Sequence, residues 1–240
     1  KSTTTSLTGK MLERAGFITT VGGNIGAPVS AQVEQSTADT LHVIEVSSFQ
    51  LEQIEQFRPW IAVMLNFSPD HLDRHHTVEA YARAKARVFE NQEAADFAVV
   101  NADDEPARQL ASSTKATRRL FSRRGAIEEG TVVDSGWIVS RSNGRSDRLV
   151  PLTSIRLLGE HLVDDVMAAA TVASLAGARA DAMTAAVDGF GGLEHAMELV
   201  ADFDGVRFVN DSKATNVEAA VRSIESFDSG VVAIVGGKFK

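Results

Sequence analysis

The sequence contains no cysteine, one tyrosine and two tryptophans among its 240 residues. The absence of cysteine excludes disulfide bonds and thiolate metal sites, and it is typical of proteins of the reducing cytosol, so we expect a cytoplasmic protein. No apolar run approaches the roughly 18 residues that a membrane span requires, and no signal peptide is visible. We therefore expect no membrane partner.

Basic clusters are also absent. Lysine and arginine total 24 against 32 aspartates and glutamates, which gives a formal net charge of −8. An acidic chain without a Lys- or Arg-rich run is a poor ligand for phosphate backbones, so we expect no nucleic-acid partner. The 44% of hydrophobic residues and 23% of charged residues are ordinary for a globular protein with a substantial core.

Apolar segments alternate with helical periodicity along most of the chain. Apolar runs predict strands at residues 18–21, 41–46, 60–67 and 95–101, and the near-continuous run at 41–46 is typical of a central parallel strand buried on both faces. Amphipathic or Ala-rich patterns predict helices at residues 2–15, 77–91, 103–111, 159–177 and 181–187. Short β segments with Gly and Asn turns at 117–151 predict a small antiparallel addition. This alternation indicates a doubly wound α/β domain.

The pattern restarts after Gly191-Gly192. A hairpin about Asp204-Gly205, a helix ending near residue 227 and a buried strand at 231–235 are predicted there. We therefore divide the chain near Leu193, into one domain of residues 1–192 and the start of a second α/β domain at 193–240.

The first residues, Lys1-Ser2-Thr3, match the end of the phosphate-binding loop G-x-x-x-x-G-K-[ST]. In that loop the lysine reaches phosphate oxygens and the next hydroxyl binds Mg²⁺, at the N-terminus of a helix. An ordinary helix N-terminus explains the same residues. Because the chain begins inside the motif and stops just after a predicted strand, we expect it to be a fragment.

Polar residues follow the first two predicted strands. Gly22-Gly23-Asn24 is either a turn or a set of donors for an anionic ligand. Glu45, at the end of an otherwise apolar strand, is either a paired structural charge or a metal ligand or base at the carboxyl edge of the sheet.

The third predicted strand leads into Ser68-Pro69-Asp70-His71-Leu72-Asp73-Arg74-His75-His76. Histidine and carboxylate side chains in such a position suit Mg²⁺ or substrate contacts. A polar surface loop is the alternative.

Lys85 lies within the apolar stripe of the helix at 77–91, beside Tyr81 and Phe89. Burial of the ammonium is costly, so its pKa should fall. One interpretation is that the side chain reaches the surface. The other is a neutral amine that condenses with CO₂, giving a carbamate with oxygen ligands for Mg²⁺.

Six segments together resemble the Mur ligases. They are Lys-Ser-Thr at 1–3, VGGNIGAP at 21–28, EVSSFQLE at 45–52, DHLDRH at 70–75, AKARVFEN at 84–91 and NDSKATN at 210–216, in the order and spacing of that family. The SSFQLE and NDSKATN versions are similar to its D-glutamate-adding branch. The resemblance implies a P-loop-type central ATPase domain followed by a Rossmann-like domain. It also implies that ATP activates the carboxylate of UDP-N-acetylmuramoyl-L-alanine for attack by D-glutamate, in peptidoglycan synthesis.

The resemblance implies site residues position by position. For ATP they are Lys1, Ser2, Thr3, Asp165 and Asp211. For two Mg²⁺ ions they are Ser2, Glu45, His71 and a carbamylated Lys85. For the muramoyl-alanine substrate they are Asn24 and Ser47, and for the region that meets nucleotide and D-glutamate they are Lys213, Thr215 and Lys240. The catalytic set is Lys1, Glu45, His71 and Lys85, and a monomer is expected.

Some positions depart from the family pattern. H-N-x-x-N-A becomes His161-Leu162-Val163-Asp164-Asp165, and H-R becomes His195-Ala196. The missing arginine would remove a charge-assisted contact to phosphate. These departures favour one alternative to the leading hypothesis, a non-catalytic, nucleotide-binding relative. A second alternative, within the same fold, is a folylpolyglutamate synthase-like ligase.

Overall fold

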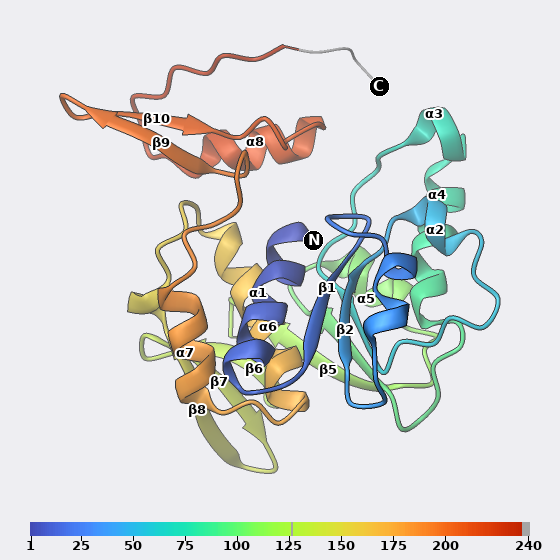
Figure 1. Ribbon diagram of the computed structural model, residues 1–240. Helices are drawn as coiled ribbons and strands as arrows, with labels where there is room; N and C mark the ends of the chain where they lie inside the picture. Colours follow the sequence, from blue (N-terminus) through green and yellow to red (C-terminus); the bar gives the residue numbers. More distant parts are fainter. Residues whose placement is uncertain (126, 237–240) are drawn as a thin grey trace.

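The computed structural model describes residues 1–125 and 127–236 (Figure 1). The helices are α1 (Ser2–Arg14), α2 (Ser48–Leu51), α3 (Leu72–His75), α4 (Val78–Ala86), α5 (Glu105–Leu110), α6 (His161–Leu175), α7 (Ala180–Asp188) and α8 (Val217–Glu225). The strands are β1 (Thr19–Gly23), β2 (Leu41–Glu45), β3 (Ile61–Met64), β4 (Phe97–Asn101), β5 (Thr117–Ser122), β6 (Gly130–Asp134), β7 (Trp137–Ser142), β8 (Arg145–Pro151), β9 (Glu198–Phe203) and β10 (Val206–Asn210).

The main sheet has six strands in the order β3-β4-β5-β6-β7-β8. Strands β3 to β6 run parallel, while β6, β7 and β8 are antiparallel neighbours. Both the parallel sheet and the antiparallel addition predicted from the sequence are confirmed. The α/β character follows from buried apolar strands, since such strands need helices on both faces.

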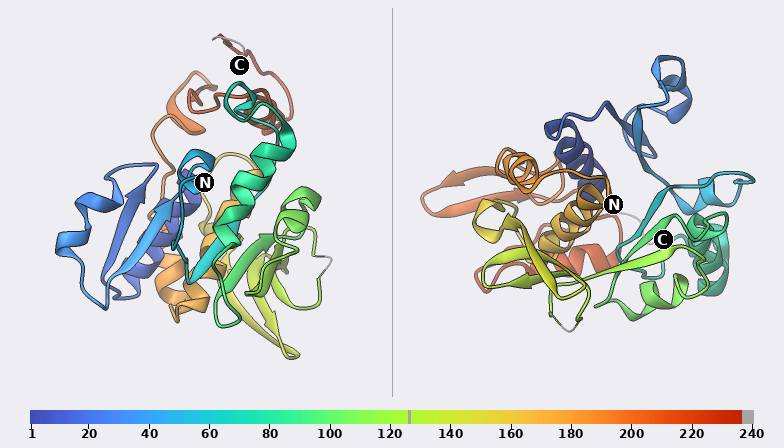
Figure 2. Two further views of the ribbon diagram at one scale, coloured as in Figure 1. Left: turned by 90° about the vertical axis from the view of Figure 1, so that its right-hand side faces the viewer. Right: turned by 90° about the horizontal axis from the view of Figure 1, so that it is seen from below.

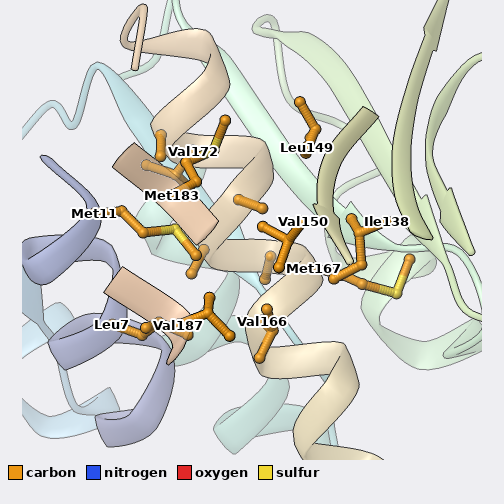
Figure 3. Close-up of a cluster of buried hydrophobic side chains, with 14 of the residues drawn as sticks. Leu7, Met11, Ile138, Leu149, Val150, Val166, Met167, Val172, Met183 and Val187 are labelled. Carbon is orange, nitrogen blue, oxygen red and sulfur yellow. The ribbon is translucent and has the colours of Figure 1, made fainter. Parts of the chain in front are cut away.

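Two apolar clusters cover the two faces of this sheet. The larger one packs α1, α6 and α7 against the sheet, with fully buried side chains such as Leu7, Met11 and Val166 (Figure 3). The smaller one packs α5 and the 3₁₀ turn after α4 against β3 and β4, around Phe89 and Ala98. The Ala-rich sequence of α6 explains its central place, because small side chains allow helix and sheet to approach closely.

Strands β1 and β2 form a separate parallel pair, with Gly23 opposite Glu45 at its end. Figure 2 shows this blue pair apart from the green and yellow strands of the main sheet. Within the described residues, the outer edges of β2 and β3 have no partner strand. A cavity of about 600 Å³ lies between them, bordered by every residue of 41–46 and 61–66.

The last part of the chain is the hairpin β9–β10 followed by α8, which lie beyond the end of the sheet where α1 begins (Figure 1). The predicted hairpin is therefore confirmed. The strand predicted at 231–235 is wrong, because this segment lies beside no described strand and Val232 and Ile234 are 90% and 99% exposed. An apolar run becomes a strand only where a neighbour accepts its hydrogen bonds. Among the described residues, no helix has the length and apolar content to span a membrane.

Candidate functional site

The first group of predicted residues meets at the carboxyl ends of β1 and β2. Glu45, only 4% exposed, ends β2. Its Oε2 accepts a hydrogen bond from Ser2 Oγ at 2.7 Å, and its Oε1 accepts one from Asn24 Nδ2 at 2.9 Å. Lys1 Nζ lies 3.3 Å from the same Oε1. The parallel register of β1 and β2 brings Asn24 and Glu45 together, since parallel strands end at one edge, and the start of α1 adds Lys1 and Ser2.

Glu45 is held in its ionised form. Burial has the largest single effect on the pKa of Glu45 and raises it, but hydrogen bonds from Asn24 and Ser2 and the charge of Lys1 together bring the pKa below its ordinary value. Glu45 is therefore a paired charge, and the two interpretations of this residue are compatible. A buried carboxylate next to a hydroxyl is an oxygen donor set that suits Mg²⁺, so these residues fit the ion that the family resemblance implies.

Lys85 borders the same cavity from α4. Its Nζ lies 5.4 Å from the centroid of the Tyr81 ring. The pKa of Lys85 falls to about 8, chiefly because burial disfavours the ammonium and then because Lys1 is nearby, while Asp70 and Glu45 act in the opposite direction. The amine therefore has an accessible neutral form, as the apolar stripe predicts.

His71 approaches this group from the turn before α3. It adopts a left-handed backbone conformation with φ of 53°, which is unfavourable for a residue with a Cβ and marks a fixed turn. Its ring lies between Phe49, at 5.1 Å between centroids, and Tyr81, at 6.2 Å. Asp70 Oδ2 is 3.8 Å from His71 Nε2. His71, Lys85 and Glu45 thus all border one cavity, on separate elements.

Asp70 and Asn216 form a contact that the sequence reasoning missed. Asn216 Nδ2 donates to Asp70 Oδ2 at 3.0 Å across 146 positions of the chain, and both residues border the cavity. Their place inside DHLDRH and NDSKATN was the available signal, but no local pattern predicts that these two motifs meet.

The predicted nucleotide residues make contacts inside the protein. The Thr4 hydroxyl on α1 donates to Asp165 on α6. Thr3, the preceding residue of α1, is buried. Asp211 Oδ1 accepts from the backbone N–H of Met197 at 2.9 Å. Leu162 is 7% exposed, so its side chain belongs to the core. Asp165 is thus tied to the helix that begins at the Lys1–Ser2 turn.

Ser47, Lys213 and Thr215 are not among the residues that border the cavity. Ser47 caps α2, accepting from the Gln50 backbone N–H at 3.3 Å. The backbone of Lys213 donates to His195 and that of Thr215 to Lys213, in the loop before α8. Lys240 lies outside the described residues. In that described part of the chain, no three His, Cys, Asp or Glu side chains are grouped closely enough to hold a metal, so a metal here would need the lysine and hydroxyl ligands as well.

Comparisons with known proteins give the same family as the motifs. The model of the Mur ligase middle domain matches residues 1–173. The UDP-N-acetylmuramoylalanine–D-glutamate ligase of Koribacter versatilis is 46% identical over the whole chain, and that of Acidobacterium capsulatum is 48% identical. The chain covers 53% and 52% of these relatives, so it spans about half their length.

Solved structures show the same fold at lower identity. MurF from Acinetobacter baumannii has a TM-score of 0.70 at 15% identity, over 94% of this chain and 51% of that one. A murein peptide ligase from Psychrobacter arcticus has a TM-score of 0.63 at 18% identity, over 94% and 52%. The matched domain model and the close relatives over the full chain establish that this chain belongs to the Mur ligase family.

Proposed function

We propose that this chain is the ATP-binding part of an enzyme that joins D-glutamate to UDP-N-acetylmuramoyl-L-alanine, releasing ADP and phosphate. The observation that carries the proposal is the group of Lys1, Ser2, Asn24 and Glu45, of which Lys1 and Glu45 border the same cavity as Lys85. The names of the most similar relatives supply the substrates. A folylpolyglutamate synthase-like ligase would instead bind a folate in the place of the UDP-sugar substrate.

The reaction begins with two anions that repel each other. The carboxylate of the substrate attacks the γ-phosphorus of ATP, the bond to ADP breaks, and an acyl phosphate forms. The amine of D-glutamate then attacks the carbonyl carbon, phosphate leaves, and the amine loses a proton. Lys1 would bind phosphate oxygens during both steps and neutralise charge that develops there. Lys1 is bound to Glu45 through a single ion pair, so its ammonium retains donors for a phosphate.

Two Mg²⁺ ions, when bound, screen the repulsion between phosphates and carboxylate. Ser2 and Glu45 would hold the first, and His71 and Lys85 the second. Lys85 needs negative charge for this role. Its neutral amine adds to CO₂, forming an N–C bond and losing one proton, which leaves a carbamate anion. The pKa of about 8 supports this proposal, because a substantial neutral fraction is present near neutral pH.

The remaining contacts are predictions from the family pattern. Asn24 and Ser47 would meet the muramoyl-alanine part, while Thr3, Asp165 and Asp211 would meet the nucleotide. Lys213, Thr215 and Lys240 would lie where nucleotide and D-glutamate meet. We also propose that a second domain begins near Leu193 and that the enzyme acts as a monomer.

The direct test is ADP release by the full-length enzyme that contains this chain. With UDP-N-acetylmuramoyl-L-alanine present, we expect release with D-glutamate and little with L-glutamate or glycine. Glu45→Gln keeps the shape of the side chain but removes its charge, and should abolish release. ADP release that requires a folate instead of the UDP-sugar would overturn the proposal. So would an enzyme that binds ATP without turning it over under all these conditions.

A further inference from the structure

A hydroxyl, an imidazole and a carboxylate lie in a row beside the cavity. Ser48 Oγ lies 2.9 Å from His75 Nε2. His75 Nδ1 lies 3.2 Å from Glu52 Oε1. Ser48 and Glu52 lie at the two ends of α2, and His75 ends α3. None of the three residues has a role in the reaction proposed above.

The imidazole is fixed in place on all sides. The His75 side chain is 1% exposed. The Phe49 ring stacks on it at 5.5 Å with an interplanar angle of 12°, and the Tyr81 ring lies 5.2 Å away. The other oxygen of Glu52 accepts from Arg74 at 3.0 Å, so the carboxylate is fixed as well. Of the three, Ser48 alone borders the cavity, which Glu45 and Tyr81 also border.

This arrangement favours one direction for the Ser48 proton. A carboxylate oxygen accepts hydrogen bonds, so Glu52 Oε1, 3.2 Å from Nδ1, favours the tautomer of His75 that carries its proton on Nδ1. Nε2 then has only a lone pair, and it accepts the single O–H of Ser48. With its proton directed at His75, the Ser48 oxygen presents lone pairs, and no donor, to the cavity. Ser48 is therefore suited to a ligand group that donates a hydrogen bond.

We propose that Ser48 is a specificity-determining residue that accepts a hydrogen bond from the amide N–H between the muramoyl and alanyl parts of the substrate. His75 and Glu52 act as positioning residues, because they hold Ser48 as an acceptor. This inference rests on the proposed function. Ser48 is the residue next to Ser47, which is predicted to contact that same part of the substrate, and the amide is the nearest N–H to the reacting carboxylate.

The proton arrangement can be tested on this chain without any ligase activity. Nitrogen-15 NMR of the imidazole, assigned by comparison with His75→Phe, should show a protonated Nδ1 and an unprotonated Nε2. Ser48→Ala should shift the Nε2 resonance and leave Nδ1 almost unchanged. A protonated Nε2 would contradict this arrangement of Ser48, His75 and Glu52, because the Ser48 hydroxyl would then be free to donate into the cavity.

The substrate contact is tested with an ester analogue, in which oxygen replaces the alanyl N–H. The full-length enzyme should use the amide about ten- to a hundredfold better in kcat/KM, since the ester loses a hydrogen bond and places an acceptor against an acceptor. In Ser48→Ala the preference should fall below about threefold. His75→Phe, which retains an aromatic ring, frees the Ser48 proton and should lower the preference by improving relative use of the ester.

A merely structural role for His75 would lower kcat/KM for both compounds equally, which contradicts the proposal. His76→Phe, at the exposed neighbouring position, is the matched control and should keep the wild-type preference. A hydroxyl, an imidazole and a carboxylate in this order also occur in enzymes that activate a hydroxyl as a nucleophile. Acylation of Ser48 by p-nitrophenyl acetate, detected as added mass, would assign it that role instead. If the enzyme uses neither compound, the proposed function fails, while the NMR result still shows which nitrogen of His75 carries the proton.

Discussion

Residues 1–192 and residues 193–236 use similar apolar patterns with different results. In the first region, α1 buries Leu7 and Met11 completely. In the second, α8 has a strongly amphipathic sequence, yet within the described structure none of its residues is buried, and Val217 is 69% exposed. The hairpin before it exposes Phe203 and Phe208 at 70% and 54%. An apolar periodicity is therefore enough to form a helix or strand, but its apolar side chains are buried only where another surface packs against them. The stability of this chain comes from the first region.

The largest contrast should come from truncating one apolar side chain in each region. Leu7→Ala removes a fully buried side chain from the larger core and should lower the free energy of unfolding by about 2–5 kcal/mol. Phe208→Ala should change it by no more than about 0.5 kcal/mol. Urea unfolding measures both, and equal losses would mean that the second region is packed as tightly as the first.

A second contrast concerns a residue whose substitution should lower activity and leave stability unchanged. In the full-length enzyme, Lys85→Ala should lower kcat by roughly a hundred- to a thousandfold, the effect of removing a group that stabilises developing charge, while the fold survives. Added acetate should restore part of the rate, and Lys85→Arg should stay inactive because a guanidinium cannot become an anion. Arg83→Ala, at an exposed position of the same helix, is the control. Near-normal turnover of Lys85→Ala would contradict the hypothesis that a carbamate on Lys85 binds the metal.

Asp164 should make the first region sensitive to pH. Burial raises the pKa of Asp164 to about 6, against an opposing effect of Arg123. Between about pH 4 and pH 6 the native protein therefore retains a proton that the unfolded chain has lost, so the free energy of unfolding should fall as the pH rises. The total loss is at most about 3 kcal/mol. Asp164→Asn should remove this slope in urea titrations, and the exposed Asp147→Asn should leave it intact.

The smallest effect should come from the contact between the regions. Asn216→Ser keeps a side chain that can cap α8 but loses the amide that donates to Asp70. We expect the loop before α8 to be cleaved about five times faster by a protease, corresponding to roughly 1 kcal/mol for one hydrogen bond. Urea unfolding of the first region should not change. Unaltered cleavage would mean that other contacts hold the two regions together.

Much of the fold and part of the site could be predicted from local patterns. A carboxylate at the end of an apolar strand indicated Glu45, and a lysine within an apolar helical stripe indicated Lys85. Asp70 with Asn216, and Ser48 with His75, could not be predicted, because each pair joins motifs far apart in the chain. The separation of β1–β2 from the main sheet was also missed, since hydrophobicity indicates that a strand is buried but not which strand lies beside it.

The two open edges beside the cavity have a consequence for handling the protein. Sheet edges usually carry a charge or a proline that prevents edge-to-edge association. β3 consists of Ile61-Ala62-Val63-Met64 and has neither, while the one charge on β2, Glu45, is turned inward to Lys1 and Ser2. These edges offer backbone donors and acceptors to a strand of another molecule, so we expect self-association of this chain to rise with protein concentration.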